Sequence, residues 1–196
     1  LYGLIKLISK MKTMEEDVSV VTGRALGYRS WRITEGPKNL LLPLIIGEGN
    51  LAWNPGENRA ICYQHTRSST DPCSHSPGKD CDCGLNAYNQ FWAAHKLYSQ
   101  CRTSVREGET VVFGAIAGYG NTRIHIDGWR SEKAEIIAFL DIKAKDSSLH
   151  PNVQKVADRF DVPAFSEDAE FFEYSKQRAI PVPLRAYPYV DSRMDR

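Results

Sequence analysis

The chain carries almost no excess of charge of either sign. Its 196 residues include 25 Lys and Arg against 24 Asp and Glu, which gives a formal net charge of +1. Proteins that neutralise nucleic acid over a whole surface are strongly basic. The balance of charges excludes that class and leaves room only for a local basic patch.

Long apolar runs are absent too. No stretch reaches the roughly 18 apolar residues that a membrane-spanning helix needs. Residues 1–10 are apolar with two lysines, but they lack the small-residue cleavage site of a secretory signal. Met11 and Met14 are alternative natural starts, so we interpret 1–22 as an extension that need not be native. We expect a cytoplasmic protein that does not enter a membrane.

Cysteines are few and odd in number, and most of them lie close together. Of the five, four fall between positions 62 and 83, and the fifth is Cys101. An odd count without a secretory signal argues against a secreted disulfide framework. The clustering instead suggests a metal site in a reducing compartment.

Sequence motifs of known catalytic centres are also missing. The chain has neither His-Glu-x-x-His nor the His-x-Glu and Pro-Cys-x-x-Cys pair of zinc deaminases. Gly114, Gly118 and Gly120 lack the spacing of a dinucleotide-binding loop, and they fall in a predicted hairpin rather than in a strand-to-helix turn. We therefore favour a protein that is not an enzyme.

Hydrophobic periodicity predicts short strands and three helices. Alternating or continuous apolar patterns indicate strands, and recurrence at three and four residues indicates helices. The predicted strands are 27–33, 40–46, 59–63, 110–116 and 122–126. The predicted helices are 85–98, 151–160 and 166–174, the last with a cap at Ser166–Asp168. Segment 134–142 is apolar enough for either a strand or the start of a helix.

The polar loop between Cys62 and Gly84 contains four thiols and two imidazoles. Zinc takes four such ligands in a tetrahedron, and its binding free energy can order a loop that has no core of its own. The preferred ligand set is Cys62, His75, Cys81 and Cys83, with Cys73 and His65 as the reserve ligands. Gly84 then gives the backbone room to turn towards the next element.

Two alternatives to zinc stay open for this loop. One is a disulfide bridge, such as Cys73 to Cys81, and the other is a set of thiols without metal. If zinc binds, four protein ligands favour a closed structural ion over a catalytic one, which needs an open position.

The fold expected from these features is α+β, with a small, mostly antiparallel sheet or partial β-barrel. It includes the zinc-clipped loop, a central helix and a helical C-terminal region. We expect the α+β domain over 23–165, followed by a helix and a proline-rich tail over 166–196.

Short pieces of the chain also occur in a specific spaced order between positions 27 and 163. They are Gly27-Tyr28-Arg29-Ser30-Trp31, Trp53-Asn54-Pro55-Gly56, Cys62, His75-Ser76-Pro77, Cys81-Asp82-Cys83-Gly84, Ala87, Val112, Gly114, Gly118, the stretch from His125 to Glu132, and the stretch from Val156 to Pro163. In this order the chain resembles a family of uncharacterised proteins found in actinobacteria and their phages. The resemblance implies no activity. It favours His75 over His65, because His75 stands in a matching piece, whereas Cys73 and Asn86 depart from the family pattern.

Arginines beside tryptophans form a second candidate site. Aromatic rings and guanidinium groups can stack on nucleobases. The candidate nucleic-acid face comprises Arg29, Trp31, Arg32, Trp129 and Arg130. The alternative is that the four tryptophans, which include Trp53 and Trp92, fill and cap the core of a small barrel.

Two further patterns have both a functional and a structural interpretation. His125 and Asp127 are two residues apart in a predicted strand, which suits an acid–base pair but also an ordinary polar face. The aromatic side of the helix predicted over 85–98 suits packing on the sheet or a groove for a partner.

Three functions remain open from the sequence. The first is a non-enzymatic, zinc-stabilised binding or regulatory module, phage-related by resemblance, with an unknown protein or nucleic-acid partner. The second is a nucleic-acid reader that uses the Arg and Trp face. The third is a zinc-dependent hydrolase or nuclease that acts through His125 and Asp127 or through an open zinc position.

Overall fold

The structure is a computed structural model, and it describes residues 23–36, 39–44, 52–62, 76–78, 83–101, 105–144 and 148–182. The predicted extension 1–22 and the end of the proline-rich tail, 183–196, lie outside these ranges. Among the described residues, no helix is both long enough and apolar enough to cross a membrane.

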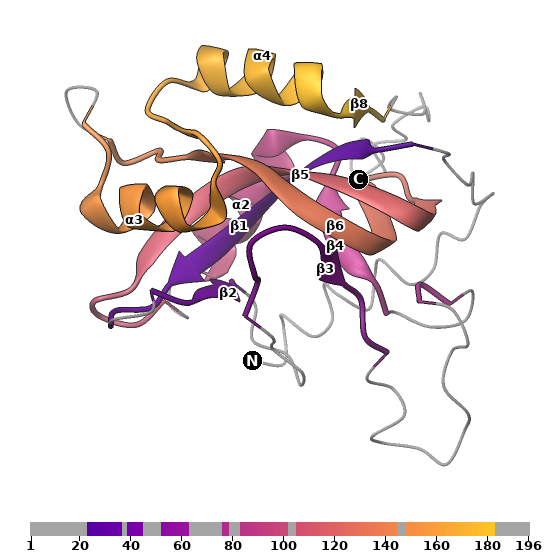
Figure 1. The fold of residues 1–196 in the computed structure, drawn as a ribbon, viewed down its shortest axis with the longest axis horizontal. Helices are drawn as coiled ribbons and strands as arrows, with labels where there is room; N and C mark the ends of the chain where they lie inside the picture. The colour runs from indigo at the N-terminus through magenta and orange to yellow at the C-terminus, as the bar shows by residue number, and fades with distance from the viewer. Residues whose placement is uncertain are drawn as a thin grey trace, which may run out of the picture.

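Three long antiparallel strands form the centre of the molecule (Figure 1). They are β1 (Ala25–Ile33), β5 (Thr110–Ile124) and β6 (Gly128–Leu140). β5 pairs with β1 along one edge and with β6 along the other. The short strand β4 (Leu85–Tyr88) pairs with β6 and also meets β1, where Tyr28 lies opposite Tyr88. β1, β5, β6 and β4 therefore close into a four-stranded barrel, which confirms the predicted antiparallel, barrel-like sheet.

Four very short strands extend this sheet. β2 (Leu41–Pro43) adds to β1 in antiparallel fashion, and β8 (Ile180–Pro181) adds to it in parallel. β3 (Asn58–Arg59) pairs antiparallel with β6, and β7 (Ala164–Phe165) pairs parallel with it.

Within the described residues, three helices lie against the sheet: α2 (Phe91–Cys101), α3 (Pro151–Phe160) and α4 (Asp168–Arg178). The prediction for α3 is confirmed, since Pro151 opens its first turn and Asp161 ends it in the left-handed conformation. The second C-terminal helix is also confirmed, but it runs to Arg178 rather than to residue 174. Its N-cap is Glu167, which makes no side-chain capping bond.

The core forms two clusters on opposite faces of the long strands. One face carries α3 with three of the tryptophans, and the other carries α2 and α4 (Figure 1). On the second face, the rings of Phe91, His95 and Tyr98 from α2 pack on Phe113 of β5. The aromatic side of α2 therefore packs on the sheet, as one of the two interpretations predicted.

The hairpin predicted over 110–126 is wrong in the position of its turn. The chain continues through Gly118–Asn121 as a single strand, β5, and the turn to β6 lies at 125–127. The glycines instead mark an irregularity, because the β5–β6 register shifts between Tyr119 and Thr122. Pairing with β6 and β1 along the whole strand outweighs the local turn preference of glycine and asparagine.

The predicted helix over 85–98 is correct only in its second part. Leu85–Tyr88 is strand β4, paired with residues 128–131 of β6, and the helix begins at Phe91. The ambiguous segment 134–142 is largely strand. A register shift leaves Ile137 as the extra residue between Ile136 and Ala138, so consecutive apolar side chains reach both core clusters.

Candidate functional site

Strands β3 and β4 lie end to end on one edge of β6. The N–H of Ala60, just after β3, donates to the carbonyl oxygen of Glu132 at 2.7 Å. At the next position of β6, Ser131 pairs with Leu85, the first residue of β4. The chain therefore leaves the edge after Ala60 and rejoins it at Leu85, at neighbouring positions of β6.

This arrangement brings the segments that lead to two predicted metal ligands to neighbouring positions of β6. Cys62 follows Ala60 by two residues, and Cys83 precedes Leu85 by two residues. Cys83 is buried and Cys62 is half-buried. The other predicted ligands, His75 and Cys81, and the reserve ligands His65 and Cys73 lie outside the described residues.

The sulfur of Cys83 accepts a backbone hydrogen bond. The N–H of Gly78 donates to Cys83 Sγ at 3.2 Å. The neighbouring Pro77 carbonyl oxygen accepts from Asn121 Nδ2 at 3.3 Å and from Arg123 Nε at 3.1 Å, which fixes this segment on β5. A backbone N–H donor at the sulfur is compatible with metal binding by Cys83.

Gly84 adopts a conformation that its neighbours require. Its φ is +128°, and a Cβ at this position would lie 3.0 Å from Arg130 Cβ and 3.1 Å from Pro77 Cβ. Only glycine allows the chain to turn here from Cys83 into β4 without displacing one of these residues. The turn predicted at Gly84 is present, but it leads into strand β4 rather than into a helix.

Arg130 links Cys83 to His125. It donates from Nη1 to the Cys83 carbonyl oxygen at 3.3 Å and from Nε to His125 Nε2 at 3.0 Å. The Nε2 atom of His125 therefore accepts a hydrogen bond from a guanidinium that is itself fixed on the Cys83 carbonyl group. His125 also lies in the turn after β5 rather than within a strand, and Asp127 is exposed. This geometry does not favour the predicted acid–base pair.

The donor chemistry at this edge fits zinc, as far as the described residues extend. The segments that lead to two of the four predicted ligands adjoin on β6, and the sulfur of Cys83 accepts an N–H···S bond. No group of three or more His, Cys, Asp or Glu side chains comes together among the described residues. A four-ligand centre here would need ligands from the loop between Cys62 and Cys83.

Three of the four tryptophans belong to the core. Trp31, Trp53 and Trp129 are 0%, 4% and 1% exposed, and Trp129 Nε1 donates to the Leu26 carbonyl oxygen. The core alternative is thus confirmed for them, and the base-stacking role predicted for Trp31 and Trp129 is wrong because their rings do not reach the surface. Trp92, at the start of α2, is 61% exposed.

The arginines of the predicted nucleic-acid face do not share one surface. Arg32 is buried and pairs with Glu109 at 3.2 Å. Arg29 lies three residues earlier on β1, so its side chain leaves the opposite face of the strand. Arg130 is engaged with the Cys83 carbonyl group and His125. The structure therefore does not bring the five residues of that candidate face together.

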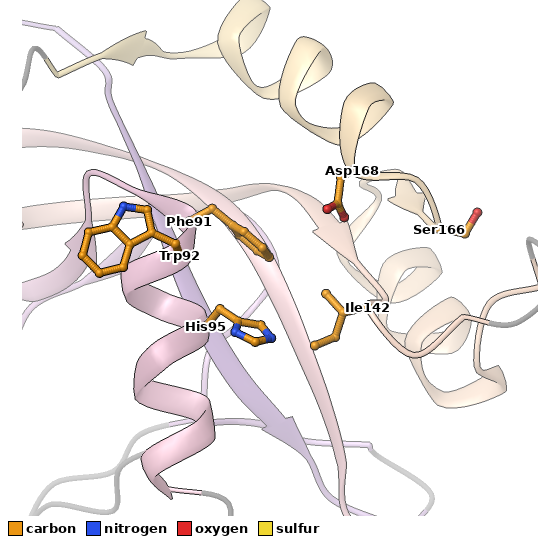
Figure 2. Close-up of a pocket in the computed structure, with 6 residues that line it drawn as sticks. All are labelled: Phe91, Trp92, His95, Ile142, Ser166 and Asp168. Carbon is orange, nitrogen blue, oxygen red and sulfur yellow. The ribbon is translucent and has the colours of Figure 1, made fainter.

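A shallow groove of about 430 Å³ lies between α2 and the start of α4. Figure 2 shows Phe91 and His95 pointing into it from α2, opposite Ile142 and Asp168. Ser166 also lines the groove, but its hydroxyl points away from His95 in Figure 2. No hydrogen bond joins the Ser166, His95 and Asp168 side chains, so the groove has residue types of a hydrolytic triad without its geometry.

Comparisons with protein-family models, with curated proteins and with solved structures yield no match to this chain. A function can therefore be inferred only from the geometry of the chain itself. The edge of β6 that binds Ala60 and Leu85 is its most specific feature, because the two segments that lead to Cys62 and Cys83 adjoin there.

Proposed function

We propose that the protein is a non-enzymatic binding or regulatory module whose 62–83 loop is held by a structural zinc ion. The ligands are Cys62, His75, Cys81 and Cys83. The observation that supports this proposal is that Ala60 and Leu85, each two residues from a predicted ligand, occupy adjoining positions of one β6 edge.

The zinc acts as a cross-link between two strands of the sheet. It joins the end of β3 to the start of β4, and it orders a polar loop that offers little apolar side chain to bury. The N–H of Gly78 supports the thiolate of Cys83, and Gly84 provides the turn that follows. Persistent thiolate ligands require a reducing compartment, so the proposal includes a cytoplasmic location.

Two observations support a binding role over catalysis. The base nitrogen of His125 is engaged by Arg130, and the side chains of the α2–α4 groove form no hydrogen-bonded catalytic set. A closed four-ligand zinc also has no free position for a substrate. The likeness to actinobacterial and phage proteins adds a phage-related context and leaves the partner open.

Metal analysis of protein purified without added metal tests the proposal. We expect stoichiometric zinc in the wild type and in Cys101→Ser, the matched control, because Cys101 lies on α2 outside the cluster. Cys83→Ser should lose most of the zinc and unfold at lower temperature. Wild-type protein without zinc, or full zinc in Cys83→Ser, would overturn the assignment.

The effect of removing the zinc on the fold distinguishes a structural ion from a catalytic one. Removing zinc with a chelator should unfold the region around β3 and β4 and expose the protected thiols to a thiol reagent. Loss of zinc with the fold and thiol protection unchanged would contradict a structural role.

A further inference from the structure

Arg29 differs from the other arginines on and next to β1. Arg24 pairs with Glu135 and Arg32 pairs with Glu109. Arg29 donates from Nη1 to the Asn86 carbonyl oxygen at 2.7 Å, and its guanidinium lies 5.4 Å from the ring centroid of Trp53. Within the described part of the chain, no carboxylate contacts Arg29.

The charge of Arg29 is poorly solvated. Burial lowers the pKa of its guanidinium from 12.5 to about 10, and the nearby Tyr88 only partly offsets this effect. Buried charges in folded proteins are normally paired, because the lost hydration is otherwise not recovered. A cation left without a counter-charge in such a place points to an anion supplied from outside the described chain.

The remaining donors of Arg29 have a defined geometry. Since Nη1 donates to the Asn86 carbonyl oxygen and the Trp53 ring makes a cation–π contact with the guanidinium, the edge formed by Nε and Nη2 remains. That edge presents two parallel N–H groups, which match the two oxygens of a carboxylate or a phosphate. Arg29 is half-buried rather than enclosed, so this edge can be reached.

We propose that Arg29, held by Trp53 and the Asn86 carbonyl group, is the anchor of a binding site for an oxyanion, the carboxylate or phosphate group of a ligand. The site goes beyond the proposed zinc-stabilised module and does not depend on the metal. Trp53 acts as a positioning residue, because it fixes the guanidinium plane without contacting the anion.

Titration with inorganic phosphate and, separately, with acetate tests this site on the full-length protein. At constant ionic strength with chloride as the reference, we expect one anion to shift the Arg29 Nε–H resonance in a saturable manner and to raise Tm. A response to phosphate alone identifies a phosphate ligand, and a response to acetate alone identifies a carboxylate.

Substitutions show whether the response belongs to Arg29. Arg29→Gln should abolish the rise in Tm, and Arg29→Lys, which keeps the charge without the two-pronged edge, should weaken binding at least about tenfold. Arg59→Gln is the matched control, because Arg59 is exposed and pairs with Glu57. No response of the wild-type Nε–H resonance to either anion, or an equal Tm response in Arg29→Gln, would overturn the proposal.

Discussion

Trp129 of β6 donates its indole N–H to the backbone carbonyl oxygen of Leu26 of β1, at 3.0 Å. These two strands share no backbone ladder, since β4 and β5 separate them around the barrel. The hydrogen bond therefore crosses the barrel interior and satisfies the one polar atom of a ring that is 1% exposed. Gly27 and Gly118 leave the space that this ring fills, because a Cβ at either position would overlap it.

Gly118→Ala tests this packing. The added methyl group would collide with the six-membered ring of Trp129, which the surrounding barrel holds in place. Overpacking of this kind typically costs about 1–3 kcal/mol, so we expect a loss of that size in the free energy of unfolding. Urea denaturation monitored by tryptophan fluorescence and by circular dichroism measures it.

A double-mutant cycle identifies the cause of that loss. Trp129→Phe removes part of the colliding ring, so Gly118→Ala should cost less in that background, with a coupling of about 0.5–3 kcal/mol. Additive effects would instead mean that the alanine disturbs the β5 backbone rather than the packing against Trp129.

The same glycines explain where prediction from sequence succeeded and failed. The alternation in 27–33 and the apolar run in 110–116 predicted the strands β1 and β5, whereas 134–142 stayed ambiguous and β4 was predicted as part of a helix. Gly118 and Gly120 favoured a turn locally, but long-range pairing with Lys133 and Ala134 decided the structure. The sequence alone does not show which strands pair. It therefore cannot reveal that a glycine makes room for a ring on another strand.

The candidate sites show a similar limit. The clustering of cysteines predicted Cys62 and Cys83 as two of four ligands, but only the register on β6 shows that the segments leading to them occupy adjoining positions. Arg29 and Arg32 look equivalent in the sequence, three residues apart beside Trp31. Strand alternation separates them, and only the structure reveals that Glu109 pairs with one of the two.

The buried ion pair between Arg32 and Glu109 gives a second prediction. Their charged atoms are 3.2 Å apart, the side chains are 6% and 9% exposed, and Arg32 Nε has no acceptor among the described residues. Glu109→Gln would leave the Arg32 charge buried and unpaired, which typically costs about 3–5 kcal/mol. We expect such a decrease in the free energy of unfolding by chemical denaturation.

An exposed pair serves as its control. Glu57 pairs with Arg59 at the surface, where solvent screens the charges, so Glu57→Gln should lower the free energy of unfolding far less than Glu109→Gln does. Similar losses for the two variants would show that water reaches the Arg32–Glu109 pair.

Tyr28 predicts a dependence of stability on alkaline pH. Burial among aromatic side chains that include Phe171 and Phe172 raises the pKa of its phenol above the ordinary value of 10.0. The folded state thus holds the phenolic proton more tightly than the unfolded state. This contribution to stability is fully present below about pH 10 and is lost as the pH rises through the raised pKa.

Tyr28→Phe removes this titration while keeping the ring. We expect it to change the free energy of unfolding by about 1 kcal/mol or less at pH 8. Between about pH 9 and pH 11, the free energy of unfolding should fall less steeply in the variant than in the wild type. Parallel profiles would mean that the Tyr28 hydroxyl is in contact with solvent.

Gly84→Ala gives a prediction that joins the fold to the metal centre. At a φ of +128° any side chain is strained, and here the new Cβ would also press on Arg130 and Pro77 at 3.0 and 3.1 Å. Those residues position the Cys83 carbonyl group and the segment whose N–H binds Cys83 Sγ. We expect both a lower Tm and a faster release of zinc to a colorimetric chelator.

Gly56→Ala separates strain from crowding, because Gly56 also has a positive φ, +75°, but no atom lies within 4 Å of the added Cβ. Backbone strain alone, about 1 kcal/mol, should then lower the Tm of both variants, whereas only Gly84→Ala should release zinc faster. Faster release from both variants would trace the effect to global destabilisation. A lower Tm with unchanged release in Gly84→Ala would mean that the turn after Cys83 does not help to hold the ion.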